Sequence, residues 1–530
     1  MTLVISMFAG LGLAEVVLLM HPAYIKRWLT DGLAVLIAIG SGLLLYYSYS
    51  LIVIVFCVFS LYRCINLERI THRKLQDDYV HHLALRASLW LLTFQTVLLA
   101  LLYVFQYGSI SLSDLLPGVA VLDAVVAVIL AHVIDAQGRK TLAPTLVSSR
   151  TEQELPTLTV AIPARNETSD LEACLATLIH SNYTKLEILV LDDCSQNTHT
   201  PEIIRQFAHD GVRFIAGKPP AKQWLAKNFA YQQLCAEANG ELILFCGVDA
   251  RFEPNSLSSI VSTMLDKRKT MMSVIPRNAN PGRFKLEALM VQPGRYAWEL
   301  VLPRRWLDRP PVLSSCWVVQ KQLVEDAGGF VAVSRAISPE RYFARYSATH
   351  HDGYSFIQSG ELLGLASTKS FTEQRATAVR TRYPSLHRRI ELTAIVSMLE
   401  IIVLVVPYVG AVQALVSQHY LVAALFVSSS ALLCYVYYQV VRITYQRPLV
   451  RGLWLLPFAA LYDVALLNYS MWQYEYSEVI WKGRNVCIPI MRVVPHLPRL
   501  SPGQGQRQNG LYERHRHQAY HHRRHGHHHV

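Results

Sequence analysis

The chain has 530 residues, of which 52% are hydrophobic and only 17% are charged, so its composition is too apolar for an ordinary soluble enzyme. The formal net charge of +12 would suit a nucleic-acid partner, but no recognised nucleic-acid motif accompanies it. Membrane proteins gather Lys and Arg on cytoplasmic loops and near anionic headgroups, so we expect a membrane protein that does not bind nucleic acid.

Apolar stretches long enough to cross a bilayer, about 20 residues each, fall into two clusters. The first cluster comprises residues 2–20, 32–64, 87–107 and 115–134, and the second comprises 391–416, 419–441 and 453–472. We expect residues 32–64 to form a tight hairpin, because they are too long for one ordinary span. Residues 1–20 lack a basic region and a clear cleavage site, which predicts a retained anchor rather than a cleaved signal peptide.

Basic loops set the expected orientation. Residues 63–74, 138–140 and 443–451 are all basic and flank membrane stretches. The positive-inside rule places these loops, and the soluble segment between the two clusters, in the cytoplasm. The nine cysteines are scattered without a C-x-x-C pair, which indicates reduced thiols in a cytosolic environment rather than a disulfide framework or a zinc site.

The segment 139–389 has the composition of a soluble domain in which strands and helical stretches alternate. Its predicted strands are residues 158–162, which stop at Pro163, and then 186–195, 211–218 and 239–250. This alternation predicts an α/β sheet with right-handed crossovers, in which ligands bind beyond the carboxyl ends of the strands.

Four acids lie at these strand ends. Glu167 follows the first strand, Asp192 and Asp193 lie in the second, and Asp249 lies at the end of the fourth. Any one such acid is usually a helix N-cap or a turn former. Acids at three separate strand ends, in chain order, favour a binding site instead.

Five motifs, in this order, carry a family resemblance: "IPARNE", "VLDDCS", "AKQWLAKNFA", "GELILFCGVDARFEP" and "DAGGF". Together they resemble family 2 glycosyltransferases of the GT-A fold, and especially membrane-anchored enzymes that glycosylate lipids or build surface polysaccharides. The similarity covers about residues 156–365. It reappears in "VIWKGRNV" (479–486), which resembles a W-x-G-R element that follows the last membrane segment of many such enzymes.

The resemblance implies a nucleotide-sugar donor and a divalent cation, Mg²⁺ or Mn²⁺, that spreads the charge of the leaving diphosphate. The family holds this metal with a D-x-D triplet at the end of a strand. Here the triplet is Gly247-Val248-Asp249, so glycine replaces the first acid. Asp249 is therefore the predicted metal ligand and takes part in catalysis.

The donor site that the resemblance implies comprises Pro163, Ala164, Glu167, Asp192, Asp193 and Lys227. Asp192 or Asp193 is expected to accept hydrogen bonds from the base or ribose, and Glu167 to form part of the wall of the nucleotide site. Lys227 matches a family lysine near the donor, where a compact ammonium suits a phosphate or base oxygen. The alternative for Lys227 is a solvated position on a helix.

The predicted catalytic base is Glu340. An inverting transfer needs a carboxylate that takes the proton of the acceptor hydroxyl. The family supplies an Asp in "E-D-x-x-L-A" after "GGF", whereas Pro339-Glu340 occupies that place here. Two alternatives stay open: Asp352 is the base, or Glu340 is only a first-turn helix acid after Pro339.

Processive relatives carry Q-x-x-R-W, which stacks on the acceptor sugar and is absent here. Arg382-Tyr383 stands nearest to it in the sequence. The residues assigned to the acceptor or donor side are Arg382, Tyr383, Trp481 and Arg484. The missing motif favours a single transfer over polymer synthesis. The basic stretch 373–389 has a second interpretation, in which its arginines lie near headgroups at the membrane surface.

The predicted domains are N-terminal membrane helices (1–138), a GT-A domain (139–389), C-terminal membrane or interfacial helices with the W-x-G-R element (390–486) and a basic, His-rich disordered tail (487–530). The predicted function is the inverting, metal-dependent transfer of a sugar from a nucleotide sugar to a membrane-associated, lipid acceptor. We expect a multi-pass protein of a bacterial-type inner or plasma membrane with a cytosolic catalytic domain. The alternatives are a processive polysaccharide synthase and a glycosyltransferase-like pseudoenzyme without turnover.

A cytosolic W-x-G-R element constrains the C-terminal topology, because three full crossings after residue 390 would place it outside. One of the three stretches is therefore expected to be interfacial or re-entrant. The candidates are 391–416 and 453–472, each of which contains an acid. We favour 391–416, because it directly follows the basic segment 373–389.

Overall fold

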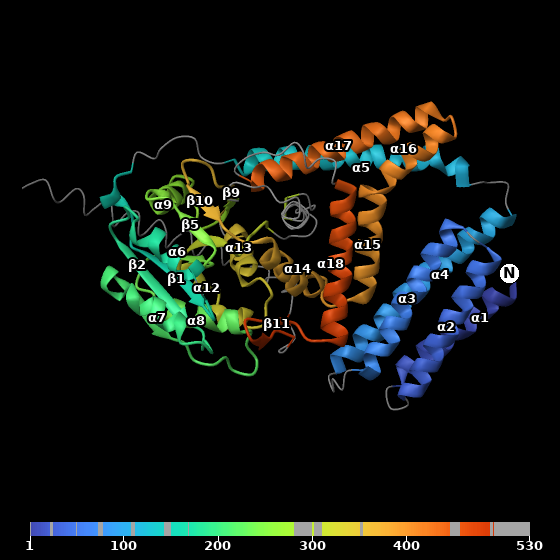
Figure 1. The fold of residues 1–530 in the computed structure, drawn as a ribbon, viewed down its shortest axis with the longest axis horizontal. Coiled ribbons are helices and arrows are strands. Elements are labelled where there is room, and N and C mark those ends of the chain that lie inside the picture. The colour runs from blue at the N-terminus through green and yellow to red at the C-terminus, as the bar shows by residue number, and fades with distance from the viewer. Residues whose placement is uncertain are drawn as a thin grey trace, which may run out of the picture.

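The computed structural model describes residues 2–21, 25–48, 50–72, 78–107, 112–142, 150–167, 169–279, 299–300, 310–349, 353–445, 456–487 and 491. Nearly all of the predicted tail (487–530) and the alternative base Asp352 lie outside these residues. The described part of the chain contains an α/β domain flanked by long helices (Figure 1).

A seven-stranded sheet forms the centre of the domain, in the order β3-β2-β1-β4-β8-β6-β9. Its strands are β1 (Leu158–Ala164), β2 (Leu186–Asp192), β3 (Val212–Ala216), β4 (Leu242–Cys246), β6 (Met271–Ile275), β8 (Cys316–Gln320) and β9 (Tyr354–Gln358). All neighbouring strands pair in parallel except β8, which runs antiparallel to both β4 and β6. Every residue of β4 is buried, as an apolar run in the middle of a covered sheet predicts.

Helices cover both faces of this sheet. They are α6 (Ser169–Ile179), α7 (His199–Gln206), α8 (Ala226–Glu237), α9 (Ser256–Asp266), α12 (Lys321–Asp326) and α13 (Pro339–Thr349), with short 3-10 turns η2 (Glu152–Glu154), η3 (Ala208–Asp210) and η4 (Phe330–Val333). Successive residues of a strand point to opposite faces, so Leu244 and Phe245 enter two different cores. Phe245 stacks on Trp317 at 4.4 Å and packs with residues of α8 and α13, whereas Leu244 packs with residues of α6 and α9.

Two small sheets complete the strands. The first has the order β5-β10-β7, made of β5 (Ala250–Phe252), β10 (Leu365–Ser367) and β7 (Arg277–Asn278). The second is an antiparallel hairpin of β11 (Ile480–Trp481) and β12 (Arg484–Asn485). This hairpin contains the W-x-G-R element.

The structure confirms the predicted α/β class and extends one predicted strand. The sheet is mixed, because β8 enters antiparallel between β4 and β6. Strand β1 continues through Pro163 to Ala164, beyond its predicted end. The ladder between β1 and β4 already ends at Ala161 and Phe245, so on that side the proline removes no ladder hydrogen bond.

The remaining helices are α1 (Thr2–Met20), α2 (Arg27–Tyr47), α3 (Leu51–His72), α4 (Asp78–Tyr107), α5 (Leu112–Lys140), α14 (Phe371–Ser385), α15 (Ile390–Leu404), α16 (Val406–Val416), α17 (Tyr420–Thr444) and α18 (Leu456–Tyr476). Within the described residues, five helices are long and apolar enough to cross a membrane: α2, α3, α4, α5 and α17. Helices α15 and α16 qualify only as a pair, which is bent by 46°. The expected hairpin within 32–64 is present as α2 and α3, which pack on one another.

Figure 1 shows α1 to α4 as a bundle, with α15 and α18 between this bundle and the α/β domain. Helices α5 and α17 lie side by side and extend over the domain (Figure 1). Ile134 of α5 and Val440 of α17 belong to the same core as Phe245. The apolar helices and the α/β domain therefore share one hydrophobic core.

Helix α18 packs along α14, a polar helix that follows the α/β domain. Arg382 of α14 forms an ion pair with Asp463 of α18. The Tyr383 amide donates to Ser470 Oγ at 3.2 Å, and the Tyr474 hydroxyl donates to Arg380 O at 2.8 Å. Asp463 thus faces a protein cation rather than lipid, which removes the cost of an acid at membrane depth.

The prediction that 391–416 is interfacial or re-entrant stays a prediction, because a 46° bend fits both a broken span and a re-entrant loop. The two arrangements differ in where residue 417, which follows α16, meets solvent. We expect Ser417→Cys and Glu478→Cys, each on a background without the nine native cysteines, to be labelled only from the cytoplasmic side. Glu478 lies two residues before the hairpin, which contacts the α/β domain through a hydrogen bond from Arg165 Nε to Lys482 O at 2.9 Å.

Labelling by a membrane-impermeant maleimide in sealed inverted and right-side-out vesicles gives the measurement. Labelling of position 417 from outside would show that α15 and α16 cross the membrane. Labelling of position 478 from outside would contradict the whole arrangement.

Candidate active site

The predicted acids meet at one edge of the seven-stranded sheet. The chain builds β2 and β3 on one side of β1 and then returns to place β4 on the other side. The carboxyl ends of β1 and β4 therefore flank a topological switch point, where open α/β sheets bind ligands. Glu167 follows β1, Asp193 follows β2 and Asp249 follows β4, so the three predicted strand ends lie at this one edge.

Asp249 is held in place by the small sheet. Ser367 Oγ, at the end of β10, donates to Asp249 Oδ2 at 2.7 Å, and the Thr368 amide donates to Asp249 O at 2.9 Å. A Cβ built on Gly247 would lie 2.5 Å from Asp249 Oδ1. The carboxylate of Asp249 thus lies over Gly247, in space that the side chain of a first acid would enter.

The donor set at Asp249 fits a hard divalent cation. Carboxylate oxygens are the ligands that Mg²⁺ prefers, and this ion usually keeps only one or two protein carboxylates together with substrate phosphates and water. Among the residues that the structure describes, no group of three or more His, Cys, Asp or Glu is arranged to hold a metal. A cation at this edge would therefore depend on Asp249 together with the diphosphate of a donor.

Two acids at the same edge form ion pairs with the W-x-G-R hairpin. Glu167 is only 7% exposed and pairs with Lys482, while Asp193 is only 4% exposed and pairs with Arg484. Burial raises the pKa of both carboxyl groups, and the two cations oppose this rise. Asp193 Oδ1 is buried without a hydrogen-bond partner in the described part of the chain.

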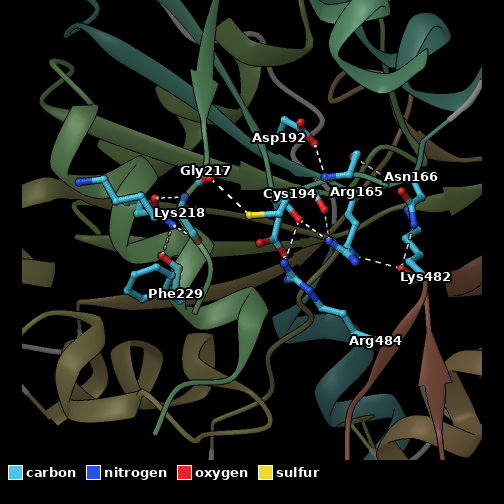
Figure 2. Close-up of polar contacts among 12 residues, drawn as sticks. Arg165, Asn166, Asp192, Cys194, Gly217, Lys218, Phe229, Lys482 and Arg484 are labelled. Atoms are coloured by element: carbon cyan, nitrogen blue, oxygen red, sulfur yellow. Dashed lines mark hydrogen bonds and ion pairs between the residues drawn. The ribbon is translucent and has the colours of Figure 1, made fainter. Parts of the chain in front are cut away.

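Arg165 links the two strand ends to the hairpin, as Figure 2 shows. Its Nη1 donates to Asp193 O at 2.6 Å and also to Cys194 O, and its Nε donates to Lys482 O at 2.9 Å. Asp192 turns the other way, because its Oδ1 accepts from the Ser195 amide at 3.0 Å (Figure 2). Asp193 is thus the acid that faces the hairpin, and Asp192 shapes the turn after β2.

The hairpin forms for a local reason. Lys482 has φ 47° and Gly483 has φ 77°, and positive φ at both central residues is the requirement of a two-residue type I′ turn. This turn directs Lys482 and Arg484 onto the sheet edge. Trp481 precedes Lys482 in the hairpin. The Arg380 guanidinium lies 4.7 Å from the centroid of the Trp481 ring.

Lys227 and Tyr231 lie one turn apart on α8, and the charge of Glu340 lies near Tyr231. Lys227, in the first turn of α8, places its ammonium 5.1 Å from the ring centroid of Tyr231. Burial raises the pKa of Tyr231 well above its usual value, and the nearby charges of Glu340 and Asp249 raise it further. Glu340, in the first turn of α13, is 3% exposed, and its Oε2 has no hydrogen-bond partner in the described part of the chain.

Arg382 and Tyr383 lie elsewhere. Arg382 forms its ion pair with Asp463, and Tyr383 is fully buried, with its hydroxyl donating to Arg388 O at 2.9 Å. In this structure both side chains fix α14 against its neighbours, so they do not meet the strand-end acids. The contact between the basic stretch and the hairpin is made by Arg380 instead.

Several residues at the site escaped the sequence analysis. Ser367 carries no motif, and only its hydrogen bond to Asp249 identifies it. Lys482 occupies the unspecified position of W-x-G-R, where the Lys-Gly pair is a recognisable hairpin signal. Pro163 and Ala164 are the last two residues of β1, and Ala164 O accepts from the Asp193 amide at 2.8 Å.

A family model described as glycosyl transferase family 2 matches residues 159–327. This range contains β1, β2, β4 and the acids that follow them. The resemblance inferred from the motifs is therefore confirmed for this part of the chain, together with the predicted fold class.

The chain is also similar to individual proteins. It is 24% identical over 216 residues to the probable glycosyltransferase YdaM of Bacillus subtilis (strain 168), covering 38% of this chain and 49% of the relative. It is 31% identical over 114 residues to the glycosyltransferase AglE of Haloferax volcanii, covering 21% of this chain and 36% of the relative. The chain thus spans about half, or less, of the length of these curated relatives.

Among solved structures, the mannosyltransferase PcManGT from Pyrobaculum calidifontis, in complex with GDP-Man and Mn²⁺, is similar over 68% of this chain and 99% of its own. The identity is 16% and the TM-score is 0.42, which is too remote a likeness to carry an argument about donor or metal. The family match comes from the sequence of this chain, and the sheet with its acids at the switch point comes from its structure. Residues 159–327 of the central domain thus match the model of glycosyl transferase family 2.

Proposed function

We propose that the chain is a membrane-anchored glycosyltransferase that transfers a sugar from a nucleotide-sugar donor to a membrane-associated, lipid acceptor. The family 2 match over residues 159–327 supports sugar transfer. Five described helices that are long and apolar enough to cross a membrane support an acceptor in the bilayer. The basic loops favour a cytosolic face for the reaction.

One observation carries the proposal: Glu167, Asp193 and Asp249 follow β1, β2 and β4 at one edge of the sheet, beside a topological switch point. Glu340, in the first turn of α13, keeps a buried carboxylate oxygen that has no hydrogen-bond partner among the described residues. An unpaired buried carboxylate oxygen is costly unless a ligand donates to it, and the hydroxyl of an acceptor is such a donor.

These residues suit an inverting displacement. The acceptor hydroxyl attacks the anomeric carbon while the bond to the nucleoside diphosphate breaks, and the diphosphate leaves with the bonding electrons. Glu340 takes the hydroxyl proton, which is general-base catalysis. Asp249 would hold Mg²⁺ or Mn²⁺, and the cation would supply charge neutralisation for the leaving diphosphate.

The donor side of the proposal rests on the hairpin. Asp193 Oδ1 is buried without a hydrogen-bond partner in the described residues. Arg484 and Arg165 both donate to the backbone carbonyl of Asp193. The acid is therefore oriented to accept a hydrogen bond from the donor's base or ribose. The burial of Tyr383 supports a single transfer, because its ring is not free to stack on an acceptor chain.

The first prediction concerns Asp249. Asp249→Asn should lower transfer by at least about 100-fold, because the neutral amide is a poorer ligand than the carboxylate for the divalent cation that would neutralise the leaving diphosphate. Asp170→Asn is the matched control, since Asp170 is a nearby half-exposed acid held by Arg251 at 2.9 Å. Release of nucleoside diphosphate by the purified protein, with and without Mn²⁺, gives the measurement. Full activity of Asp249→Asn would refute the metal assignment, and no release by the wild type would favour the pseudoenzyme.

A second prediction tests the glycine that replaces the first acid. Gly247→Ala should lower transfer, by up to about 100-fold, because the new Cβ displaces the Asp249 carboxylate from its position beside Ser367. Val248→Ala is the control, because it shortens the neighbouring side chain without entering that space. Activity of Gly247→Ala equal to that of the control would mean that the position of the carboxylate is not critical.

A third prediction concerns the base. Glu340→Gln keeps the size of the side chain but cannot accept the proton, so the turnover rate should fall about 100-fold or more while donor binding survives. Glu325→Gln, at an exposed acid of α12, should leave both unchanged. Turnover and donor affinity are measured separately, by product formation and calorimetry. If Asp352→Asn is the variant that loses turnover, the assignment of Glu340 is wrong.

A further inference from the structure

Three buried arginines can be compared: Arg63 lies inside the bundle of α1, α3 and α4, whereas Arg69 and Arg388 lie where α3 meets α14 and α18. Arg63 and Arg69 belong to α3 and are 1% and 2% exposed, and Arg388 lies between α14 and α15 and is 6% exposed. A buried guanidinium is costly unless its charge and its N–H groups are matched. The partners of each arginine can therefore be compared directly.

Arg63 and Arg388 use the same edge of the guanidinium to hold a carboxylate. The Nε and Nη2 of Arg63 both donate to Glu15 Oε2, at 2.9 and 2.5 Å. The Nε and Nη2 of Arg388 both donate to Glu475 Oε1, at 3.3 and 2.9 Å. This edge of the planar group presents two parallel donors, which match the oxygens of a carboxylate or a phosphate.

Arg69 differs from both. Its Nη1 makes long contacts with the Tyr383 hydroxyl, at 3.4 Å, and with Arg388 O, at 3.5 Å. Its Nε and Nη2 are buried and have no hydrogen-bond partner among the described residues. Glu475, an acid near Arg69 in the described part of the chain, forms its ion pair with Arg388 instead. The edge formed by Nε and Nη2 holds a carboxylate in Arg63 and Arg388. In Arg69 the same two donors are buried and have no partner among the described residues.

We propose that this edge of Arg69 binds a phosphate group carried by a membrane lipid. The position suits a lipid headgroup, because Arg69 lies in the last turn of α3, at the end of an apolar helix. Tyr476 of α18 donates to Ile65 O of α3 at 2.6 Å, which fixes α18 beside the same end of the helix. A phosphate matches the charge and the fork of the guanidinium and offers an oxygen to each of its two donors. The inference rests on buried charge and does not depend on the proposed sugar transfer.

The test measures lipid binding without any donor. Full-length protein in a neutral detergent is titrated with phosphatidic acid, with phosphatidylcholine as the zwitterionic lipid and with inorganic phosphate, and the unfolding temperature is followed. Phosphatidic acid should raise the unfolding temperature of the wild type, because a ligand that binds only the folded state stabilises it. Protection by inorganic phosphate in the same concentration range would overturn the lipid source and assign the site to free phosphate.

Three substitutions make the test specific. Arg69→Gln removes the charge, and Arg69→Lys keeps the charge but loses the paired donors. Both substitutions should weaken the binding of phosphatidic acid roughly tenfold to a hundredfold, as expected for the loss of hydrogen bonds to a charged group. Arg27→Gln is the matched control, because the Arg27 side chain is 77% exposed and starts α2 at the same end of the α2–α3 hairpin. Wild-type affinity in Arg69→Lys, or an equal loss in Arg27→Gln, would overturn the site.

Stability without lipid gives an independent readout. Arg69→Gln should unfold at or above the temperature of the wild type, because it removes a buried charge without a partner. Arg388→Gln should unfold at a lower temperature, because it leaves Glu475 buried and unpaired. If Arg69→Gln is destabilised as much as Arg388→Gln, then Arg69 has a protein partner and no open edge.

Discussion

The contact on which the rest of the site depends is the double ion pair between the W-x-G-R hairpin and the sheet edge. Lys482 and Arg484 meet Glu167 and Asp193 across 315 and 291 residues of chain. Both acids are nearly fully buried, and breaking a buried pair by removing one partner costs about 3–5 kcal/mol. The strand ends therefore require the residues that follow α18, so the C-terminal helices and the α/β domain form one folding and functional unit.

The same constraint organises the long helices. Acids and arginines within them are expensive unless they face protein. Asp463 pairs with Arg382 of α14, Glu15 of α1 pairs with Arg63 of α3, and Glu475 of α18 pairs with Arg388 in the segment between α14 and α15. Apolar side chains supply the area of these contacts, and the ion pairs favour the faces on which buried charges meet their partners.

The fold of the α/β domain was predictable where local pattern decides it. The apolar run of β4 and the helical pattern after Asp170 identify elements that the structure contains, because burial on both faces of a sheet demands an unbroken apolar strand. The observed strand ends differ from the predicted ones by a few residues, as at Ala164, because pairing with neighbouring strands sets them rather than composition. The direction of β8 depends on which strands it lies between, and no local pattern encodes that.

For the site, the sequence by itself determined the acids at three strand ends and the family that carries them, since residue type and order suffice for both. It also placed Trp481 and Arg484 in a separate motif far along the chain. Only the tertiary structure decided that Lys482 and Arg484 meet Glu167 and Asp193, that Tyr383 is buried rather than free to stack on a sugar, and that Arg69 keeps an open edge. Such outcomes depend on which distant groups satisfy a buried charge, and that is a property of the packed chain rather than of any stretch of its sequence.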